Sequence, residues 1–167
     1  MKLVELKNIF GQLNSVGVRY IVVGGLAVVA QGYPRMTHDL DIVIKLESDD
    51  MTGLWGVLTA IGYVPSVPVT LAEFIDENNR RAWQTDKNMQ VLHFQHPEWP
   101  FAGVDVFIQE PFDFDTEYQA CPNEEIAPGL SIRYARIETL IAMKSNTGRA
   151  KDADDIENLK LLLGSQK

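Results

Sequence analysis

Short β-rich segments recur along this chain, and stretches with the spacing of amphipathic helices separate them. The expected strands are 20–23, 40–44, 91–95, 104–108 and a short one at 131–134. The expected helices run from residue 3 to near residue 17 and over 26–31, 49–61, about 71–79, 136–146 and 150–163. Residues 110–130 contain three prolines and are expected to be irregular or a poor helix. This order predicts one α/β domain over residues 1–167, with a core at about 18–134 and closing helices at about 136–163.

The composition is that of a globular protein. Apolar residues make up 46% of the 167 residues and charged residues 23%, which excludes a disordered or fibrous chain. No apolar run approaches the roughly 20 residues that a membrane helix needs, and charges interrupt the N-terminal segment, so no membrane partner and no signal peptide are expected. A single cysteine, Cys121, excludes a disulfide framework. The expected location is the cytoplasm.

The net charge of −8 is unevenly distributed. Residues 88–132 contain eight acids and no Lys or Arg, whereas the rest of the chain has fifteen acids and fifteen bases. Broad electrostatic attraction of a polyanion is therefore not expected, although single phosphates could be held locally.

The segment Asp39-Leu40-Asp41-Ile42 places two acids on one face of a strand, because alternate side chains of a strand share a face. Like charges on one face repel, and a divalent cation such as Mg²⁺ would remove the repulsion. Asp105 stands alone in the apolar segment 104–108. If the two strands are neighbours, Asp105 becomes a third ligand, and three carboxylates can hold two metal ions. The alternative is that these acids lie on solvated strand edges.

Gly24-Gly25 follows the first strand and precedes a helix, which would allow backbone N–H groups to approach a triphosphate. The same glycines could serve only tight packing. Arg35 and Thr37 precede the acidic strand, where they could orient phosphate or fix the loop.

The closing helices carry charged residues on their expected buried stripes. Lys144 continues the stripe of Ile137, Leu140 and Ile141, and Asp152 continues that of Ile156, Leu159 and Leu163. These two residues are expected either to pair with each other or to point into a site. Nearby, Asp155 is expected to help cap its helix, and Asp154 to face water.

The histidine and tryptophan side chains give weaker indications of function than the acids and glycines. His93 and His96 are expected to point to opposite sides of their segment, which does not favour a zinc site. Tryptophan side chains are expected in the core rather than on a base-stacking surface, namely Trp55, Trp83 and Trp99.

Taken in order, three motifs resemble the nucleotidyltransferase superfamily, which has the fold of DNA polymerase β: Gly24-Gly25, Arg35-x-Thr37-x-Asp39-Leu40-Asp41-Ile42 and Val104-Asp105-Val106. The tail resembles the branch of AbiEii-type toxins from abortive-infection toxin–antitoxin systems, through Leu140-Ile141-Ala142-Met143-Lys144 and Gly148-Arg149-x-Lys151-Asp152-x-x-Asp155. The resemblance implies a nucleotidyltransferase fold, with a mixed twisted sheet flanked by helices and a C-terminal helical hairpin.

The resemblance also implies roles for single residues. Asp39 and Asp41 would bind Mg²⁺, and Asp105 would complete the metal site and activate the acceptor. The phosphates of a nucleoside triphosphate (NTP) would lie against Gly24 and Gly25, with two Mg²⁺ ions bound alongside. In this branch, the positions of two residues of the closing helices are needed for activity, Lys144 and Asp152, and Lys144 would contact a phosphate. The implied reaction transfers a nucleoside monophosphate (NMP) to an acceptor and releases pyrophosphate.

The acceptor stays open between RNA such as tRNA, a protein and a small molecule. The acidic region argues against a broad RNA footprint unless a partner such as an antitoxin supplies basic surface. Many AbiEii-like toxins are also longer than this chain. Compact aminoglycoside nucleotidyltransferases share the core and use acidic pockets for cationic drugs. Two further hypotheses are a catalytically inactive module that binds nucleotide or a protein, and a structural domain with ion-paired acids.

Overall fold

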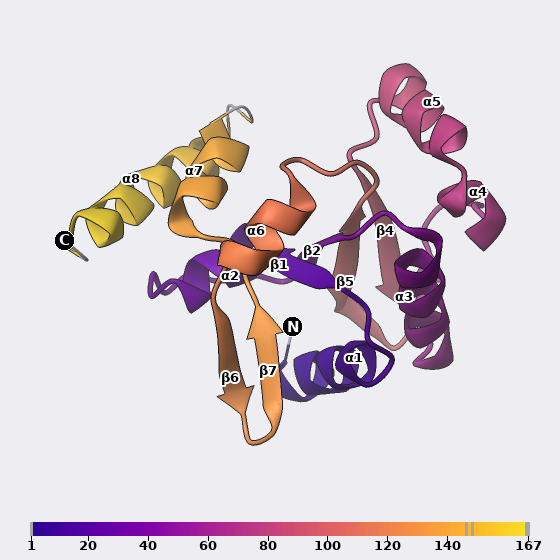
Figure 1. Cartoon of the computed structure of the whole chain (residues 1–167), viewed down its shortest axis with the longest axis horizontal. Coiled ribbons are helices and arrows are strands. Elements are labelled where there is room, and N and C mark those ends of the chain that lie inside the picture. The colour runs from indigo at the N-terminus through magenta and orange to yellow at the C-terminus, as the bar shows by residue number, and fades with distance from the viewer. Residues whose placement is uncertain (1, 146, 148, 166–167) are drawn as a thin grey trace.

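The computed structural model describes residues 2–145, 147 and 149–165 (Figure 1). Its strands are β1 (Tyr20–Val23), β2 (Leu40–Ile44), β3 (Val64–Pro65), β4 (Val91–His96), β5 (Trp99–Phe107), β6 (Asn123–Ala127) and β7 (Leu130–Arg133). Its helices are α1 (Leu3–Ser15), α2 (Gly24–Ala30), α3 (Ser48–Ala60), α4 (Leu71–Ile75), α5 (Glu77–Lys87), α6 (Phe114–Ala120), α7 (Ile137–Ser145) and α8 (Ala150–Ser165). The expected mixed α/β class is confirmed.

The main sheet is mixed, with the strand order β1-β2-β5-β4-β3. β2 and β5 run parallel, whereas the other neighbouring pairs are antiparallel. β6 and β7 form a separate hairpin, which meets β1 through one parallel bridge between Val22 and Tyr134. The pairing of β2 with β5 matters for function, because each of these strands carries an acid in an otherwise apolar run.

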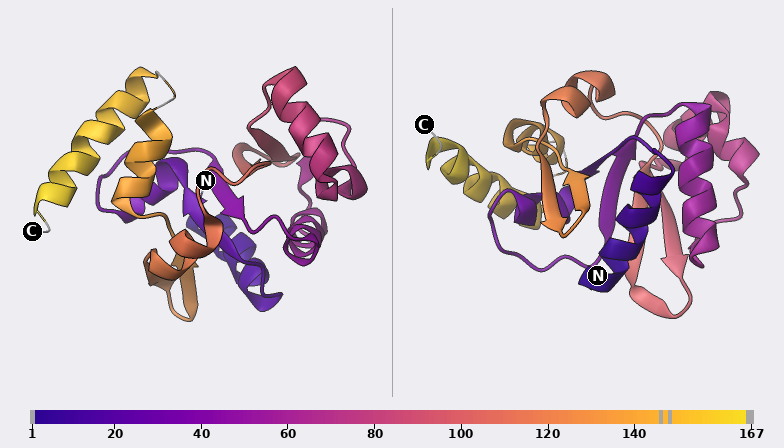
Figure 2. Two further views of the ribbon diagram at one scale, coloured as in Figure 1. Left: turned by 45° about the horizontal axis from the view of Figure 1, so that its top comes forward. Right: turned by 60° about the horizontal axis from the view of Figure 1, so that its bottom comes forward.

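Helices α1 and α3 pack side by side against one face of the sheet (Figure 2). Phe10 of α1 stacks on Tyr20 of β1, with ring centroids 5.4 Å apart. The three apolar residues of β2 that share a face are fully buried, namely Leu40, Ile42 and Ile44. Burying side chains of this size stabilises the fold by about 1.5–3 kcal/mol each. Asp41 therefore belongs to the opposite face, as its alternation with these residues predicted.

Residues 71–87 form two helices instead of the single helix expected at about 71–79. Asp76 ends α4 and caps α5, since its carboxylate accepts the N–H of Asn78 at 2.8 Å. Buried Arg80 then donates to the carbonyl oxygens of Phe74 and Ile75, at 2.7 and 2.6 Å. These carbonyls at the end of α4 would otherwise lack partners in a buried place, so Arg80 stabilises the break.

The prediction for residues 110–130 was partly right: the region contains the short helix α6, but it also contains the strand β6, which was not expected. All three prolines fall in connections: Pro111 before α6, Pro122 between α6 and β6, and Pro128 in the turn to β7. Asp113 caps α6 by accepting the N–H of Thr116 at 2.8 Å. Proline here bounds the elements rather than interrupting them.

Helices α7 and α8 form the expected C-terminal hairpin, at the opposite end of the molecule from α4 and α5 (Figures 1 and 2). Asn146 and Gly148, which belong to the predicted helix end and turn, lie outside the described residues. The stripe predicted for α8 was only partly right: Leu159 is buried, but Ile156 and Leu163 are only partly buried, and the other buried residue is Asp155, 1% exposed. No described helix is long and apolar enough to cross a membrane.

The predicted placement of the tryptophans is confirmed. Trp83 is buried, and Trp55 and Trp99 are partly buried residues packed against the core. Trp55 has its ring 5.3 Å from that of Phe94, and Trp99 stacks on His96 at 3.9 Å.

Candidate active site

Two of the three predicted acids face each other across neighbouring strands. In the parallel pair β2–β5, Asp41 is in register with Asp105, so the strands are neighbours as the sequence required. Asp39 lies one residue before β2, and all three side chains line one cleft of about 1110 Å³. The sheet therefore brings the predicted carboxylates to one surface.

The pKa of Asp41 is raised by its burial and by the neighbouring carboxylates on this surface. Burial, followed by the charges of Asp105 and Asp39, raises its pKa to about 6. A backbone hydrogen bond from Gly25 and the charge of Lys144 act in the opposite direction. A nearby positive charge would therefore stabilise the ionised form of Asp41.

The Gly24–Gly25 turn closes tightly over the acidic strand. Gly24 has φ +60°, and a Cβ atom there would lie 2.0 Å from Oδ2 of Asp41. A Cβ on Gly25 would lie 2.7 Å from Oγ1 of Thr37 and 3.3 Å from Cζ of Arg35. Real Cβ atoms rarely make contacts as short as these. Asp41, Thr37 and Arg35 can therefore approach the turn only because Gly24 and Gly25 have no side chains.

The loop before β2 carries the other two predicted nucleotide-binding residues, and both line the cleft. Thr37 donates its hydroxyl to the carbonyl oxygen of Asp39 at 3.3 Å. Arg35 forms an ion pair with Asp155 of α8. Both residues hold this loop in place, which is one of the two roles the sequence left open.

His93 of β4 is a site residue that the sequence did not single out as functional. Its Nδ1 lies 2.6 Å from Oδ1 of Asp105. A Cβ on Gly103 would lie 2.3 Å from Cε1 of His93 and 2.9 Å from Oδ1 of Asp39. Gly103 therefore leaves the space in which the side chains of His93 and Asp39 lie, and His93 in turn contacts Asp105. His96, by contrast, packs against Tyr63 and Trp99, away from this group.

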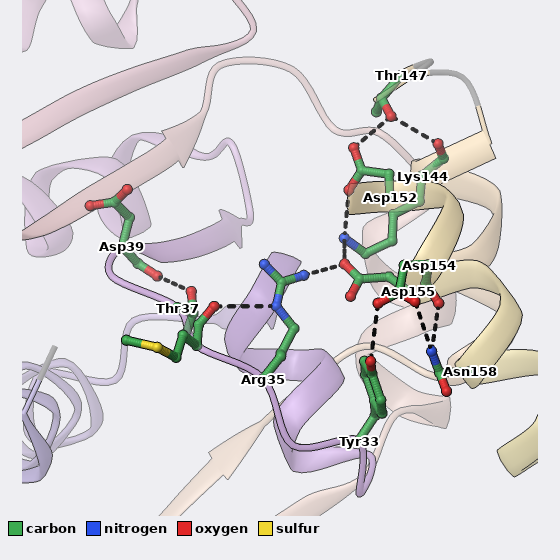
Figure 3. Close-up of polar contacts among 11 residues, drawn as sticks. Tyr33, Arg35, Thr37, Asp39, Lys144, Thr147, Asp152, Asp154, Asp155 and Asn158 are labelled. Atoms are coloured by element: carbon green, nitrogen blue, oxygen red, sulfur yellow. Dashed lines mark hydrogen bonds and ion pairs between the residues drawn. The ribbon is translucent and has the colours of Figure 1, made fainter. Parts of the chain in front are cut away.

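Lys144 and Asp152 pair with each other and also line the cleft. The ammonium group of Lys144 lies 3.0 Å from Asp152 and 2.8 Å from Asp155 (Figure 3). Asp152 also accepts the hydroxyl of Thr147 at 2.6 Å, and these contacts lower its pKa against the effect of burial. Asp154 is exposed as predicted and accepts the hydroxyl of Tyr33 at 3.0 Å.

The three cleft carboxylates have the donor chemistry that suits Mg²⁺. All their ligand atoms are carboxylate oxygens, and a divalent cation would offset the repulsion that raises the pKa of Asp41. Within the described residues, however, no group of three or more His, Cys, Asp or Glu side chains converges closely enough to hold a metal ion. Asp105 is turned onto His93, while Asp39 lies beside Gly103.

Several solved structures resemble the chain along nearly its whole length. The lincosamide antibiotic adenylyltransferase LnuA, bound to lincomycin, matches with TM-score 0.63 and 18% identity over 97% of this chain and 98% of that one. The antibiotic-resistance factor ANT(2″)-Ia matches with TM-score 0.58 and 13% identity, over 97% and 82%. TM1012 of Thermotoga maritima, assigned as a nucleotidyltransferase, matches with TM-score 0.56 and 16% identity, over 98% and 92%.

No protein-family model and no curated protein sequence matches the chain. At such low sequence identities, the structural similarity supports an assignment of the fold alone. The chain has the nucleotidyltransferase fold.

Proposed function

We propose that this protein is a Mg²⁺-dependent nucleotidyltransferase, which moves an NMP from an NTP to an acceptor hydroxyl and releases pyrophosphate. The observation that carries the proposal is the register of Asp41 with Asp105 directly beneath the Gly24–Gly25 turn. The glycine turn and the three carboxylates thus line one cleft. An NTP substrate is consistent with the expected cytoplasmic location.

Asp39, Asp41 and Asp105 are the residues that would hold Mg²⁺, which supplies positive charge to the triphosphate and the transferring group. Among the cationic side chains that line the cleft, Lys144 and Arg35 stabilise charge on the phosphate oxygens. Asp105 accepts the proton of the acceptor hydroxyl, while its hydrogen bond with His93 fixes the direction of its carboxylate.

A small molecule is the acceptor that the structure favours. The cleft volume of about 1110 Å³ is slightly larger than the roughly 300–1,000 Å³ of a site for one small ligand, which leaves room for a nucleotide together with a small acceptor. The cleft wall formed by residues 88–112 has no Lys or Arg for an RNA backbone. Two similar structures are antibiotic-modifying proteins: LnuA holds lincomycin, and ANT(2″)-Ia was crystallised with adenylyl-2″-tobramycin. A hydroxylated, drug-sized acceptor is consistent with all three observations.

A toxin that modifies tRNA is the second candidate. It is favoured by the Lys144–Asp152 pair, the feature through which the sequence resembles AbiEii-type toxins. An antitoxin would then be the partner, and because the wall formed by residues 88–112 has no Lys or Arg, that partner would have to supply basic surface for the RNA.

The experiment incubates the protein with each α-labelled NTP, Mg²⁺ and a cell extract, and follows the label into small-molecule, RNA and protein fractions. The Asp41→Asn variant is the control. Label in the small-molecule fraction supports the favoured acceptor, and label in RNA supports the toxin candidate. Nucleotide binding without any labelled product would contradict the proposed transfer activity and favour an inactive nucleotide-binding module.

A further inference from the structure

Asp155 is a buried carboxylate that the proposed reaction does not use. Its side chain is 2% exposed and lies in the second turn of α8 between two cations (Figure 3). It lies 2.8 Å from the ammonium group of Lys144 and forms an ion pair with the guanidinium of Arg35, which is 120 residues away in sequence. A burial this complete requires a partner for the charge, and Asp155 has two.

Both cations are held next to the glycine turn. The guanidinium of Arg35 packs on Gly25, where a Cβ would lie 3.3 Å from its Cζ. Lys144 is close enough to Asp41 for its charge to lower the pKa of that acid. The side chains of Arg35 and Lys144 are only 11% and 9% exposed, and both line the cleft.

A counter-ion shared by two like charges stabilises both of them and also fixes their relative position. Lys144 has a second partner in Asp152, so its amine keeps an anchor without Asp155. Arg35 has no second carboxylate partner among the described ion pairs, and its Nε makes only a long 3.5 Å contact with the carbonyl of Met36. The placement of Arg35 therefore depends on Asp155 more than that of Lys144 does.

We propose that Asp155 is a positioning residue: its carboxylate holds Arg35 beside Lys144 at the Gly24–Gly25 turn, where this pair receives the phosphates of the nucleotide. The inference rests on the proposed function for the identity of the ligand. Asp155 acts through Arg35 and does not touch the substrate. The two acids and two bases of the cluster balance in charge, which keeps both long side chains ordered before nucleotide binds.

The test follows the side-chain Nε–H signal of Arg35 by ¹H–¹⁵N NMR while Mg²⁺ and the α,β-methylene analogues of ATP, GTP, CTP and UTP are added. In the wild-type protein and in Asp154→Asn, one of the analogues shifts this signal. In Asp155→Asn the signal no longer responds. Asp154→Asn is the matched control, because it changes the neighbouring, exposed carboxylate of the same helix.

A double-mutant cycle provides the second readout. Arg35→Gln and Asp155→Asn each lower kcat for NMP transfer by about tenfold, and the double variant loses about tenfold rather than a hundredfold, because both remove the same interaction. The double variant keeps the charge balance of the cluster, so it folds even if Asp155→Asn alone does not.

The inference is contradicted if the Arg35 signal responds equally in wild type and Asp155→Asn, or if it does not respond in the wild type. It is also contradicted if kcat of the double variant falls by the product of the two single losses, about a hundredfold. If the Arg35 signal responds as expected but no acceptor is ever labelled, the proposed transfer fails while the role of Asp155 stands.

Discussion

His93 and Asp105 are joined across the β4–β5 pair by a 2.6 Å hydrogen bond between Nδ1 and Oδ1. The bond leaves one oxygen of Asp105 fixed against the imidazole. It therefore determines how the carboxylate is presented to the cleft, where we place the acceptor hydroxyl.

We predict that His93→Ala lowers the rate of NMP transfer by about tenfold or more, as loss of a residue that orients a ligand commonly does. His93 is 38% exposed, so the melting temperature should change little. His93→Asn, whose amide can still donate, should retain more activity than His93→Ala. Equal rates for wild type and His93→Ala would show that the orientation of Asp105 does not depend on this bond.

Gly103→Ala should damage the site while sparing the fold. The new methyl group meets His93 and Asp39, whereas alanine is no worse than glycine in a strand. Transfer should fall by at least about tenfold. Gly56→Ala, at a glycine with open space around it, is the control and should leave transfer unchanged. A fully active Gly103→Ala protein would contradict the close packing of His93 with Asp39.

Asp41→Asn should abolish transfer and leave the metal-free protein as stable as wild type or more so. The raised pKa of about 6 means that ionisation of Asp41 opposes folding. This penalty, about 3 kcal/mol, is full above pH 6 and disappears as the pH falls below about 4, because the folded state binds the proton more tightly than the unfolded state. Thermal melts with a chelator, at pH 7.5 and at pH 4, measure the difference between the two proteins. A variant less stable than wild type at pH 7.5 would contradict the crowding of carboxylates.

Gly24→Ala tests the turn above Asp41. Its positive φ costs about 1–2 kcal/mol for any L side chain, and the new Cβ must also displace the Asp41 carboxylate. Gly17→Ala is the matched control, because Gly17 has φ +74° but open space around it. The control should lose stability but keep its transfer rate per folded molecule, whereas Gly24→Ala should lose both. Urea unfolding and single-turnover transfer separate these effects.

The acids of the site could be predicted because a carboxylate within an apolar strand is energetically unfavourable unless it has a partner, and such positions can be recognised in the sequence. Asp41 and Asp105 interrupt apolar strands, and alternation alone assigns Asp41 to the face opposite Leu40 and Ile42. That these strands are neighbours followed from the resemblance to nucleotidyltransferases, since alternation within one strand does not reveal its partner.

His93 could not be predicted from local pairing rules. A hairpin turning at residues 97–98 pairs His96 with Trp99, and regular counting then places His93 opposite Ala102. An irregularity in the pairing between Phe94 and His96 shifts the register by three residues, so that His93 faces Asp105 instead. Such irregularities depend on packing around the strand and leave little trace in a single sequence.

Asp155 was missed for a similar reason. It stands in a helix beside the apolar stripe, where an acid near a helix start is normally a solvated cap. Its burial depends on Arg35, a residue of a distant loop. Such a partner emerges only when the fold brings the two segments together.

The most direct measurement of the central claim is calorimetric titration of the protein with a non-hydrolysable NTP analogue, with and without Mg²⁺, repeated on the Asp41→Asn/Asp105→Asn double variant. If the carboxylates gather to hold Mg²⁺ with the nucleotide, the wild-type protein binds at least about tenfold more tightly with Mg²⁺, and the double variant loses this dependence. Binding by the wild-type protein that is equally strong with and without Mg²⁺, or that is absent in both cases, would contradict the account.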